Sequence, residues 1–540
     1  RMMAALSREI WRSCVSAAVG VNVDGVMAPS HHVGAIGFAE LAAAAACGLR
    51  ALGDGEMLSI DALLDADTAR DAELLVRSLC ARHGCALEGA TVDPDGRGLL
   101  LRVRGTARKP HCADILDHVR HTCCELKSSA VSVDVIACIA FATHASAAAS
   151  AEPGEAAAYH EHLFVGVDFA STEEEISALL VLDLLNLGSG YKLQLAACQL
   201  GRYKHGEWGS AFVCMLEGTE AAARAGPLTA VRMAGWTIEQ TETHFQLPAA
   251  TSEQGEARAR EVRAALVELN SLVTSALRSA GEALLARGHA SGGALVLSLL
   301  RSPPHADDSP LESDGSPLPG NVGPARRTSL PLTAASLVET LASFLPPFND
   351  VGTRREGAGL QGGRACSCAA GGGSTAAAWR AERAVPILKK AQLLTASLHA
   401  RFGGVRGQLE LPEWRLVGVE RLTVAADPVL PAVLRAEGCL LYSDSLSQLV
   451  DGGMPVGGAD ETEIRASTIV ACEVIRVALG EHRRGAGPAS ELAPGHGRKE
   501  GNPGPSVSAS ELDLLLWGVL GKSGKHRHAP RHITRGIWWH

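Results

Sequence analysis

The sequence predicts a mainly α-helical fold with a small β-containing insertion near the N-terminus. Two stretches, Ala257–Leu285 and Ala334–Leu345, have apolar residues at the three- and four-residue spacing of helices. Strand patterns occur only before residue 160, at Leu99–Val103 and Val131–Ile139, and a turn sequence at Asp93–Gly96 precedes the first of them. We therefore expect residues 84–150 to form an insertion that carries a small β element.

The remaining chain is divided by changes in composition. Three segments are rich in Pro, Ser, Asp and Gly and bury too little apolar surface to offset the entropy of ordering, so we expect them to be disordered. They lie near residues 303–330, 352–378 and 482–508. The predicted organisation is a helical N-terminal part (1–83), the insertion (84–150) and a core (151–540).

Charge and cysteine content exclude several classes of function. The 540 residues include 50 Lys and Arg and 59 Asp and Glu, a net charge of -9 that argues against a surface for nucleic acid. None of the 14 cysteines forms a matched pair with zinc-ligand spacing, so we expect no metal and a reducing, cytoplasmic compartment. No apolar run is long enough to cross a membrane, and we expect no membrane partner. The chain begins at Arg1, which leaves organelle targeting and the oligomeric state open.

Three motifs follow one another along the core. The first is VLDLLNLGSGY at Val181–Tyr191, and the last comprises LDLLLW at Leu512–Trp517 and PRHITRGIWW at Pro530–Trp539. Between them, Ala426-Asp427 precedes a helix containing Pro431, and a Gly-x-Leu-x-Tyr-Ser step and a Glu-x-Glu-Ile-Arg-Ala segment follow. Weaker matches are FLPPFND at Phe344–Asp350 and the segment Lys389–Gln392.

In this order, the motifs resemble those of the queuosine-salvage family, the queuosine 5′-phosphate N-glycosylase/hydrolases, over residues 160 to 540. The resemblance implies a helical fold similar to that of helix-hairpin-helix DNA glycosylases. It also implies hydrolysis of the N-glycosidic bond of a small-molecule nucleotide, queuosine 5′-monophosphate, which releases queuine for reinsertion into tRNA. No cofactor and no direct nucleic-acid partner are implied. Two alternatives are a nucleotide-binding paralogue without catalysis and a DNA-type base glycosylase, and the acidic balance counts against the second.

Asp427 is the candidate catalytic residue. Asp followed by Pro428 is a typical helix start, and Gly438 supplies the stop, so the bland interpretation is a helix N-cap. The two interpretations are compatible, because backbone N–H groups and the helix dipole both favour an ionised carboxylate. Such an anion would stabilise the oxocarbenium-like sugar that develops when an N-glycosidic bond breaks, or attack it as a nucleophile.

A second group of candidates lies at the end of a predicted helix that begins with the capping pair Ser171 and Glu174. Asp183 falls on its apolar stripe, where a charge is costly unless paired or functional, so it is either a buried structural partner or a ligand contact. The family match favours the ligand. Substrate contacts are also expected from Asn186, Ser189, Gly190 and Tyr191, although a plain helix-ending loop has the same composition.

The remaining candidates follow from the motifs. Phe348 and Tyr442 are candidates for stacking on a purine-like base, although aromatic residues near helices are more often core. Asp350, Glu463 and Arg465 are further candidate substrate contacts, and the segment around Glu463 also has the pattern of a helix N-cap.

Lys390, His532 and Arg535 are the phosphate candidates. The last two lie in a basic C-terminal run that is otherwise typical of a solvated tail. Its other members are Lys522, Lys525, His526, Arg527, His528 and Arg531.

Overall fold

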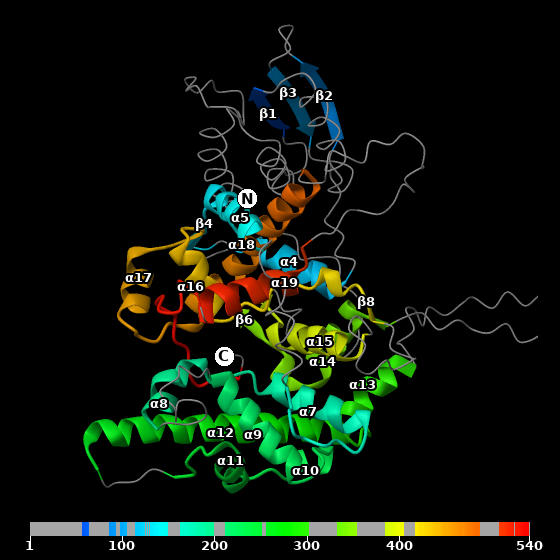
Figure 1. Cartoon of the computed structure of the whole chain (residues 1–540), viewed down its shortest axis with the longest axis vertical. Helices are drawn as coiled ribbons and strands as arrows, with labels where there is room; N and C mark the ends of the chain where they lie inside the picture. Colours follow the sequence, from blue (N-terminus) through cyan, green and yellow to red (C-terminus); the bar gives the residue numbers. More distant parts are fainter. Residues whose placement is uncertain are drawn as a thin grey trace, which may run out of the picture.

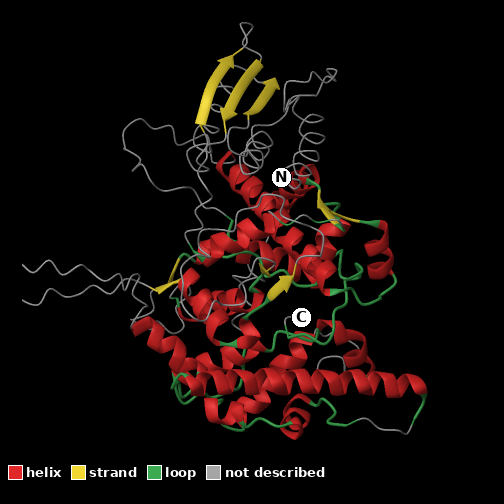
Figure 2. Cartoon of the chain, turned by 180° about the vertical axis from the view of Figure 1, so that it is seen from behind, coloured by secondary structure: helices red, strands yellow, loops and turns green. Residues whose placement is uncertain are grey.

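The computed structural model has a mainly helical architecture, which confirms the predicted fold class (Figure 2). The residues that it describes are 57–63, 86–92, 98–104, 114–124, 126, 128, 130–149, 163–198, 211–250, 255–301, 332–353, 384–403, 416–485, 507–522 and 524–538. The more specific similarity to helix-hairpin-helix glycosylases stays a prediction.

One group of helices is built on the long helix α12 (Ala257–Ala286), which coincides with the predicted helix (Figure 1). Its buried positions, among them Leu266, Leu269, Val273 and Leu277, recur every three or four residues, so one face of the helix enters the core. Helices α7, α8, α10 and α11 pack on α12, and α9 and α13 pack on α7. Their bounds are Thr172–Leu184 (α7), Lys192–Ala197 (α8), Ala211–Arg224 (α9), Ala230–Ala234 (α10), Ile238–Phe245 (α11) and Gly292–Arg301 (α13).

A second group surrounds α18 (Gly458–Gly485). This helix packs against α4 and α5, which come from the N-terminal half of the chain, and against α16. The C-terminal helix α19 continues directly into a π-helical segment, η7, that packs on α16. The bounds are Ile115–Cys124 (α4), Val135–Ala149 (α5), Val429–Ala436 (α16), Asp444–Asp451 (α17), Ala509–Leu514 (α19) and Leu515–Lys522 (η7).

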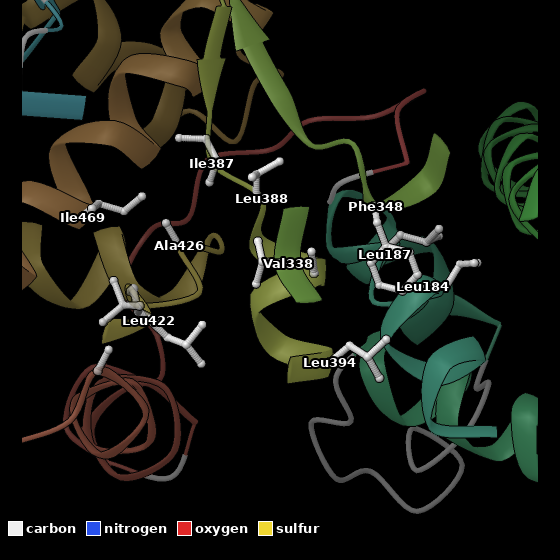
Figure 3. Packing of buried hydrophobic residues seen from close by; sticks show 14 of the residues in the cluster. Leu184, Leu187, Val338, Phe348, Ile387, Leu388, Leu394, Leu422, Ala426 and Ile469 are labelled. Carbon is white, nitrogen blue, oxygen red and sulfur yellow. The ribbon is translucent and has the colours of Figure 1, made fainter. Parts of the chain in front are cut away.

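Between the two groups lie α14 (Ala334–Phe344) and α15 (Lys389–Phe402). α14 confirms the second predicted helix and ends one residue earlier than expected. The core here combines buried side chains of α7, α14, α15 and the segment before α16 (Figure 3). Three short 3₁₀ turns complete the helical structure at Ser189–Tyr191 (η1), Pro346–Phe348 (η3) and Val419–Arg421 (η6).

The strands in the described part of the chain form four small sheets. The largest is antiparallel, in the order β1-β3-β2, with β1 at Met57–Leu63, β2 at Ala86–Val92 and β3 at Gly98–Arg104. Strand β3 confirms the predicted strand at Leu99–Val103. The three two-stranded sheets pair β4 (Val131–Val133) with β9 (Leu440–Tyr442), β5 (Leu332–Thr333) with β8 (Leu416–Val417), and β6 (Val351–Thr353) with β7 (Ala384–Pro386).

The strand predicted at Val131–Ile139 is wrong beyond Val133, where α5 begins instead. Asp134 ends the strand because its Oδ1 atom accepts a hydrogen bond from the backbone N–H of Ala137, at 3.0 Å, as a helix cap. The alternating apolar pattern that suggested a strand is therefore the start of an alanine-rich buried helix.

The domain boundaries stay predictions, but two observations bear on the N-terminal ones. Strand β1 lies before residue 84, so the β element begins inside the segment expected to be helical. Helices α4 and α5 contribute Leu116, Val119 and Ala142 to the main core, so both helices pack into that core. Most of the segments expected to be disordered lie outside the described residues.

Among the described residues, no single helix is long and apolar enough to cross a membrane. One bent pair, Thr172–Leu184 with Ser189–Ala197, passes the test of length and composition.

Candidate active site

A cavity of about 410 Å³ lies where both groups of helices meet α15. Its walls come from α7 with the turn after it, from α15, from the segment before α16, from α19 with η7, and from the C-terminal segment. Their polar and charged members are Asp183, Asn186, Ser189, Lys192, Lys389, Gln392, Ser397, Thr423, Asp427, Ser510, Asp513, Lys522, Arg527, His528, Arg531 and His532. Segments far apart in the sequence therefore build one site.

Asp427 lines this cavity and also caps α16. Its Oδ1 atom accepts hydrogen bonds from the backbone N–H groups of Val429, at 2.7 Å, and Leu430, at 3.1 Å. The side chain is partly buried. As the sequence predicted, α16 ends just before Gly438, which has a left-handed φ of 77°. The cap fixes one carboxylate oxygen of Asp427 in the cavity wall, so the helix-cap interpretation is confirmed and the catalytic one stays a prediction.

The end of α7 and the turn that follows bring Asp183, Asn186, Ser189 and Gly190 to the cavity. Asp183 is 5% exposed, and burial raises the pKa of its carboxyl to about 7, although a hydrogen bond with Ser397 opposes this shift. Within the described residues, neither Asp183 Oδ2 nor Ser189 Oγ has a hydrogen-bond partner, although both atoms are buried. Buried polar atoms of this kind in a cavity wall point to a ligand.

Two further groups belong to the centre of the site. Lys389, at the start of α15, is 3% exposed, and its Nζ atom donates to Asn186 Oδ1 at 3.1 Å. Burial lowers the pKa of this ammonium group, and the charge of Asp427 opposes that shift. Asp513 accepts a hydrogen bond from the backbone N–H of Ala425 at 2.6 Å. Burial and the charge of Asp427 raise the pKa of the Asp513 carboxyl to about 7.

Cations gather at another part of the cavity. Burial and the neighbouring charge of Arg531 lower the pKa of Lys522 to about 7, while the charge of Asp427 opposes this. Burial and Arg531 also lower the pKa of Lys192, to about 8. Lys522 Nζ lies 4.6 Å from the centre of the Trp517 ring, which also lines the cavity. Like charges crowded together in a partly buried pocket favour the binding of an anion.

The electrostatic neighbours give these groups an order. Asp183 interacts with Lys389, Lys389 with both Asp427 and Lys522, and Asp427 with Lys522. Asp513 interacts with both Asp427 and Lys389, whereas Lys192 and Arg531 interact with Lys522. The cavity thus has a carboxyl end at Asp183, a centre with two carboxyls and one ammonium, and a cationic end.

Two of the three predicted phosphate contacts make hydrogen bonds within the protein, and their contact with phosphate stays a prediction. Lys390 is fully buried, and its Nζ atom donates to the carbonyls of Leu184, at 2.6 Å, and Trp538. Arg535 donates from Nε to the carbonyl of Gly190 at 2.9 Å. Neither residue lines the cavity, whereas the third candidate, His532, is buried and does.

Tyr191 also serves the C-terminal segment instead of the cavity. Its hydroxyl accepts from the backbone N–H of Gly536 at 3.1 Å, and Arg535 lies over its ring with 5.5 Å between centres. Gly190 is needed for the same contact, because a Cβ atom there would lie 2.0 Å from the carbonyl oxygen of Thr534. Gly190 does line the cavity as predicted.

Five other predicted substrate contacts lie outside the cavity lining. Phe348 is a fully buried core residue (Figure 3), and Tyr442 lies in strand β9 with Arg435 over its ring, 4.8 Å away. Neither aromatic ring is placed to stack on a base in the cavity, because the core or a surface arginine occupies its faces.

Glu463 is not a helix cap, because α18 already begins at Gly458. Its Oε2 atom accepts from Ser128 Oγ at 2.7 Å and from the backbone N–H of Ala130 at 3.0 Å, and so holds the segment before β4. Asp350 and Arg465 form a buried ion pair with each other.

The sequence reasoning missed Lys389, Asp513, Lys192 and Lys522 as site residues, and it interpreted the basic run as a solvated tail. Signals existed for two of them. Asp513 is the aspartate of the LDLLLW motif. Lys389 directly precedes Lys390, which was predicted to contact the phosphate. In the basic run, Lys525 and His526 also lie outside the cavity lining, and both contact Glu437 Oε1, at 2.5 and 2.6 Å.

Comparison with known proteins agrees with the motifs. Residues 376–539, which include Lys389, Asp427, Asp513 and the basic run, match the family model described as queuosine salvage protein. Over these residues the chain is similar to the queuosine-salvage family, in agreement with the resemblance that the motifs indicated. One relative, a queuosine 5′-phosphate N-glycosylase/hydrolase from Sphaerobacter thermophilus, is 27% identical over 209 residues. The match covers 38% of this chain and 48% of the relative, so the chain spans about half the length of that protein.

In the described part of the chain, no group of three or more His, Cys, Asp or Glu side chains is arranged to hold a metal ion.

Proposed function

We propose that this protein hydrolyses the N-glycosidic bond of queuosine 5′-monophosphate and releases queuine and ribose 5-phosphate. The observation that carries the proposal is the order of charged groups along the cavity. A nucleotide presents a polar base, then the anomeric carbon, then a phosphate, and the cavity offers a carboxyl end, a mixed centre and a cationic end in the same order. The match to the queuosine-salvage family model and the name of the relative support the same activity.

The base would lie at the Asp183 end. A purine-like base carries N–H donors and ring or carbonyl acceptors on its edge. Asp183 Oδ2 accepts from such a donor, and the Ser189 hydroxyl donates or accepts, so both buried atoms gain the hydrogen bonds that they lack without a ligand. The nearby Asn186 is held by Lys389 and adds one more polar contact.

The phosphate would lie at the cationic end. Lys522, Lys192 and Arg531 repel one another there, and a phosphate dianion removes that repulsion. Binding should therefore raise the pKa values of both lysines toward their ordinary range, so that both are fully charged in the complex. Contacts at this remote group position the scissile bond at Asp427.

The reaction breaks the bond between C1′ and the base nitrogen, and the electron pair leaves with the base. Asp427, whose carboxylate is fixed by two backbone N–H groups, stabilises the positive charge that develops on the sugar. A water molecule then supplies hydroxyl to C1′ and loses one proton, while the base nitrogen gains one.

Asp513 is suited to handle these protons. Its carboxyl has a pKa of about 7, so both protonation states are populated near neutral pH. Two neighbouring carboxyls commonly divide the charge-stabilising and proton-transfer roles in glycoside hydrolysis. We assign the charge-stabilising role to Asp427 and the proton-transfer role to Asp513.

The test is incubation of the purified protein with queuosine 5′-monophosphate, with queuine and ribose 5-phosphate measured by mass spectrometry. Equal molar amounts of both products are expected, and heat-denatured protein gives the background rate. Saturable binding of the nucleotide without base release over hours would contradict hydrolysis and would leave a nucleotide-binding paralogue.

A further inference from the structure

A buried group of three charged residues lies behind the cavity wall. Arg465 on α18 is 1% exposed and contacts both carboxylate oxygens of Asp350, with N–O distances of 2.9 and 2.5 Å. Its Nη1 atom also lies 3.0 Å from Glu461 Oε1, one turn earlier on the same helix. We call Arg465, Asp350 and Glu461 the buried triad. None of the three lines the cavity.

Arg465 of the buried triad binds the segment that carries Asp427. Arg465 Nε donates to the carbonyl oxygen of Ala426 at 2.9 Å. Ala426 is fully buried, so its carbonyl has no access to solvent and depends on this bond. Since Asp427 is the next residue, the guanidinium fixes the peptide plane from which the catalytic candidate departs.

Asp350 of the buried triad binds the start of α15. Asp350 Oδ2 accepts from the backbone N–H of Lys389 at 3.1 Å. The carbonyl oxygen of Asp350 accepts from the N–H groups of Ile387 and Leu388, both at 3.0 Å. Leu388 has a left-handed φ of 51°, a strained conformation for a leucine that the surrounding bonds must maintain. Leu388 therefore sets the direction of the first turn of α15 and places Lys389 in the cavity wall.

A buried ion pair of this kind is weak as a device for stability. Desolvation of the charges offsets much of their attraction, and apolar replacements of such pairs are often neutral or stabilising. Fixed geometry is a better account, because the planar guanidinium binds Asp350 with two nitrogens and still directs a third donor at Ala426.

We propose that Arg465 and Asp350 are positioning residues whose ion pair sets the placement of the Asp427 carboxylate relative to the Lys389 ammonium. The proposal rests on the proposed function for its catalytic consequence. A lysine at position 465 keeps the charge but offers a single point donor, so it cannot hold Asp350 and Ala426 in the same geometry.

The experiment compares Arg465→Lys with Arg401→Lys. Arg401 is the matched control because its Nε atom pairs with Glu175 Oε1 at 2.7 Å, between α15 and α7, and neither residue lines the cavity. With queuosine 5′-monophosphate, Arg465→Lys should lower kcat about 100-fold and change KM by less than about 3-fold, because misplacement of reacting groups affects the transition state more than binding. Arg401→Lys should change both by less than about 3-fold.

A double-mutant comparison separates positioning from general damage. If the triad acts largely through Asp427, Arg465→Lys should lower kcat much less in an Asp427→Asn background than in the wild type. A purely structural role predicts the same loss in both backgrounds. If Arg465→Lys does not fold, Asp350→Asn, which keeps the shape and one acceptor, takes its place in every arm.

A readout without turnover distinguishes failure of this proposal from failure of the proposed function. The pKa of Asp513 is raised by Asp427 and lowered by Lys389, so it reports their placement. It is measured by NMR with carboxyl-labelled aspartate and assigned with Asp513→Asn. Arg465→Lys should shift this titration, and Arg401→Lys should not. An unchanged Asp513 titration together with unchanged kcat would overturn the positioning role, whereas a shifted titration in a protein that never releases queuine would overturn only the proposed function.

Discussion

Replacement of Asp427 by Asn tests the centre of the proposed mechanism. The Asn side chain retains a carbonyl oxygen that can accept from the N–H groups of Val429 and Leu430, so the cap on α16 and the fold should survive. What is lost is one negative charge beside the anomeric carbon. For unit charges about 4 Å apart and an effective dielectric constant of about 20, the lost attraction is roughly 4 kcal/mol. Turnover of queuosine 5′-monophosphate should therefore fall by about 1,000-fold.

The same substitution has a second consequence that does not depend on turnover. The charge of Asp427 raises the pKa of Asp513 and opposes the lowering of the pKa of Lys522. Asp427→Asn should therefore lower the pKa of the Asp513 carboxyl and lower that of the Lys522 ammonium further. Both shifts are measured by NMR titration of the variant and the wild type.

Asp134→Asn is the matched control for this experiment, since Asp134 caps α5 in the same way and lies outside the cavity lining. It should leave turnover within about 3-fold of the wild type. Rates of queuine release are measured by mass spectrometry, and thermal melting checks that both variants fold. If Asp427→Asn turns over within about 10-fold of the wild type, the charge at this position does not stabilise the transition state and the mechanism is wrong.

Three further predictions follow from the geometry. Lys522→Met should lower kcat/KM for the monophosphate by about 100-fold and leave kcat/KM for the nucleoside within about 3-fold, because it removes a phosphate contact. The control is Lys525→Met, which loses only a pair with Glu437. Equal losses on both substrates would show that Lys522 does not bind the phosphate. Asp183 has a raised pKa, so it contributes stability that is present below the unfolded value near pH 4 and is lost as pH rises through about 7. Between about pH 4 and pH 7, the free energy of unfolding measured with urea should fall by about 4 kcal/mol because of this group, and Asp183→Asn should reduce this dependence on pH. The same dependence on pH in the variant would mean that Asp183 is not the titrating group. Gly190→Ala should lower both the melting temperature and turnover, because the new Cβ meets the carbonyl of Thr534. Gly458→Ala, where a Cβ has no neighbour within 4 Å, should change neither. If Gly190→Ala melts at the temperature of the wild type, the C-terminal segment can move aside.

Local structure was predictable where neighbouring residues decide it. The helices at α12 and α14, the strand β3 and the caps at Ser171 and Asp427 depend on periodicity and on side chains that bond to the next turn. These forces act within a few residues, so the sequence contains them directly. The prediction failed at Val131–Ile139, where a strand pattern and a buried helix have the same apolar content and only the cap at Asp134 distinguishes them.

The family motifs predicted which segments matter but not which side chains face the cavity. Lys389 and Lys390 are neighbours in one motif, yet successive residues of an α-helix point about 100° apart. Lys389 lines the cavity, whereas Lys390 binds backbone carbonyls behind it. The same holds for Asp350 and Arg465, whose charges neutralise each other inside the core instead of binding substrate.

The sequence by itself determined the helical class, the resemblance to the queuosine-salvage family and the choice of Asp427 as a candidate, because these follow from local patterns and from motif order. Only the tertiary structure decided that Lys192, Lys389, Asp513 and Lys522 share one cavity and that the basic C-terminal run forms part of its wall. The physical reason is that burial and the electrostatic neighbours of a charge depend on segments hundreds of residues away. A lysine in a solvated tail and a lysine in a phosphate pocket have the same local sequence, and packing alone separates them.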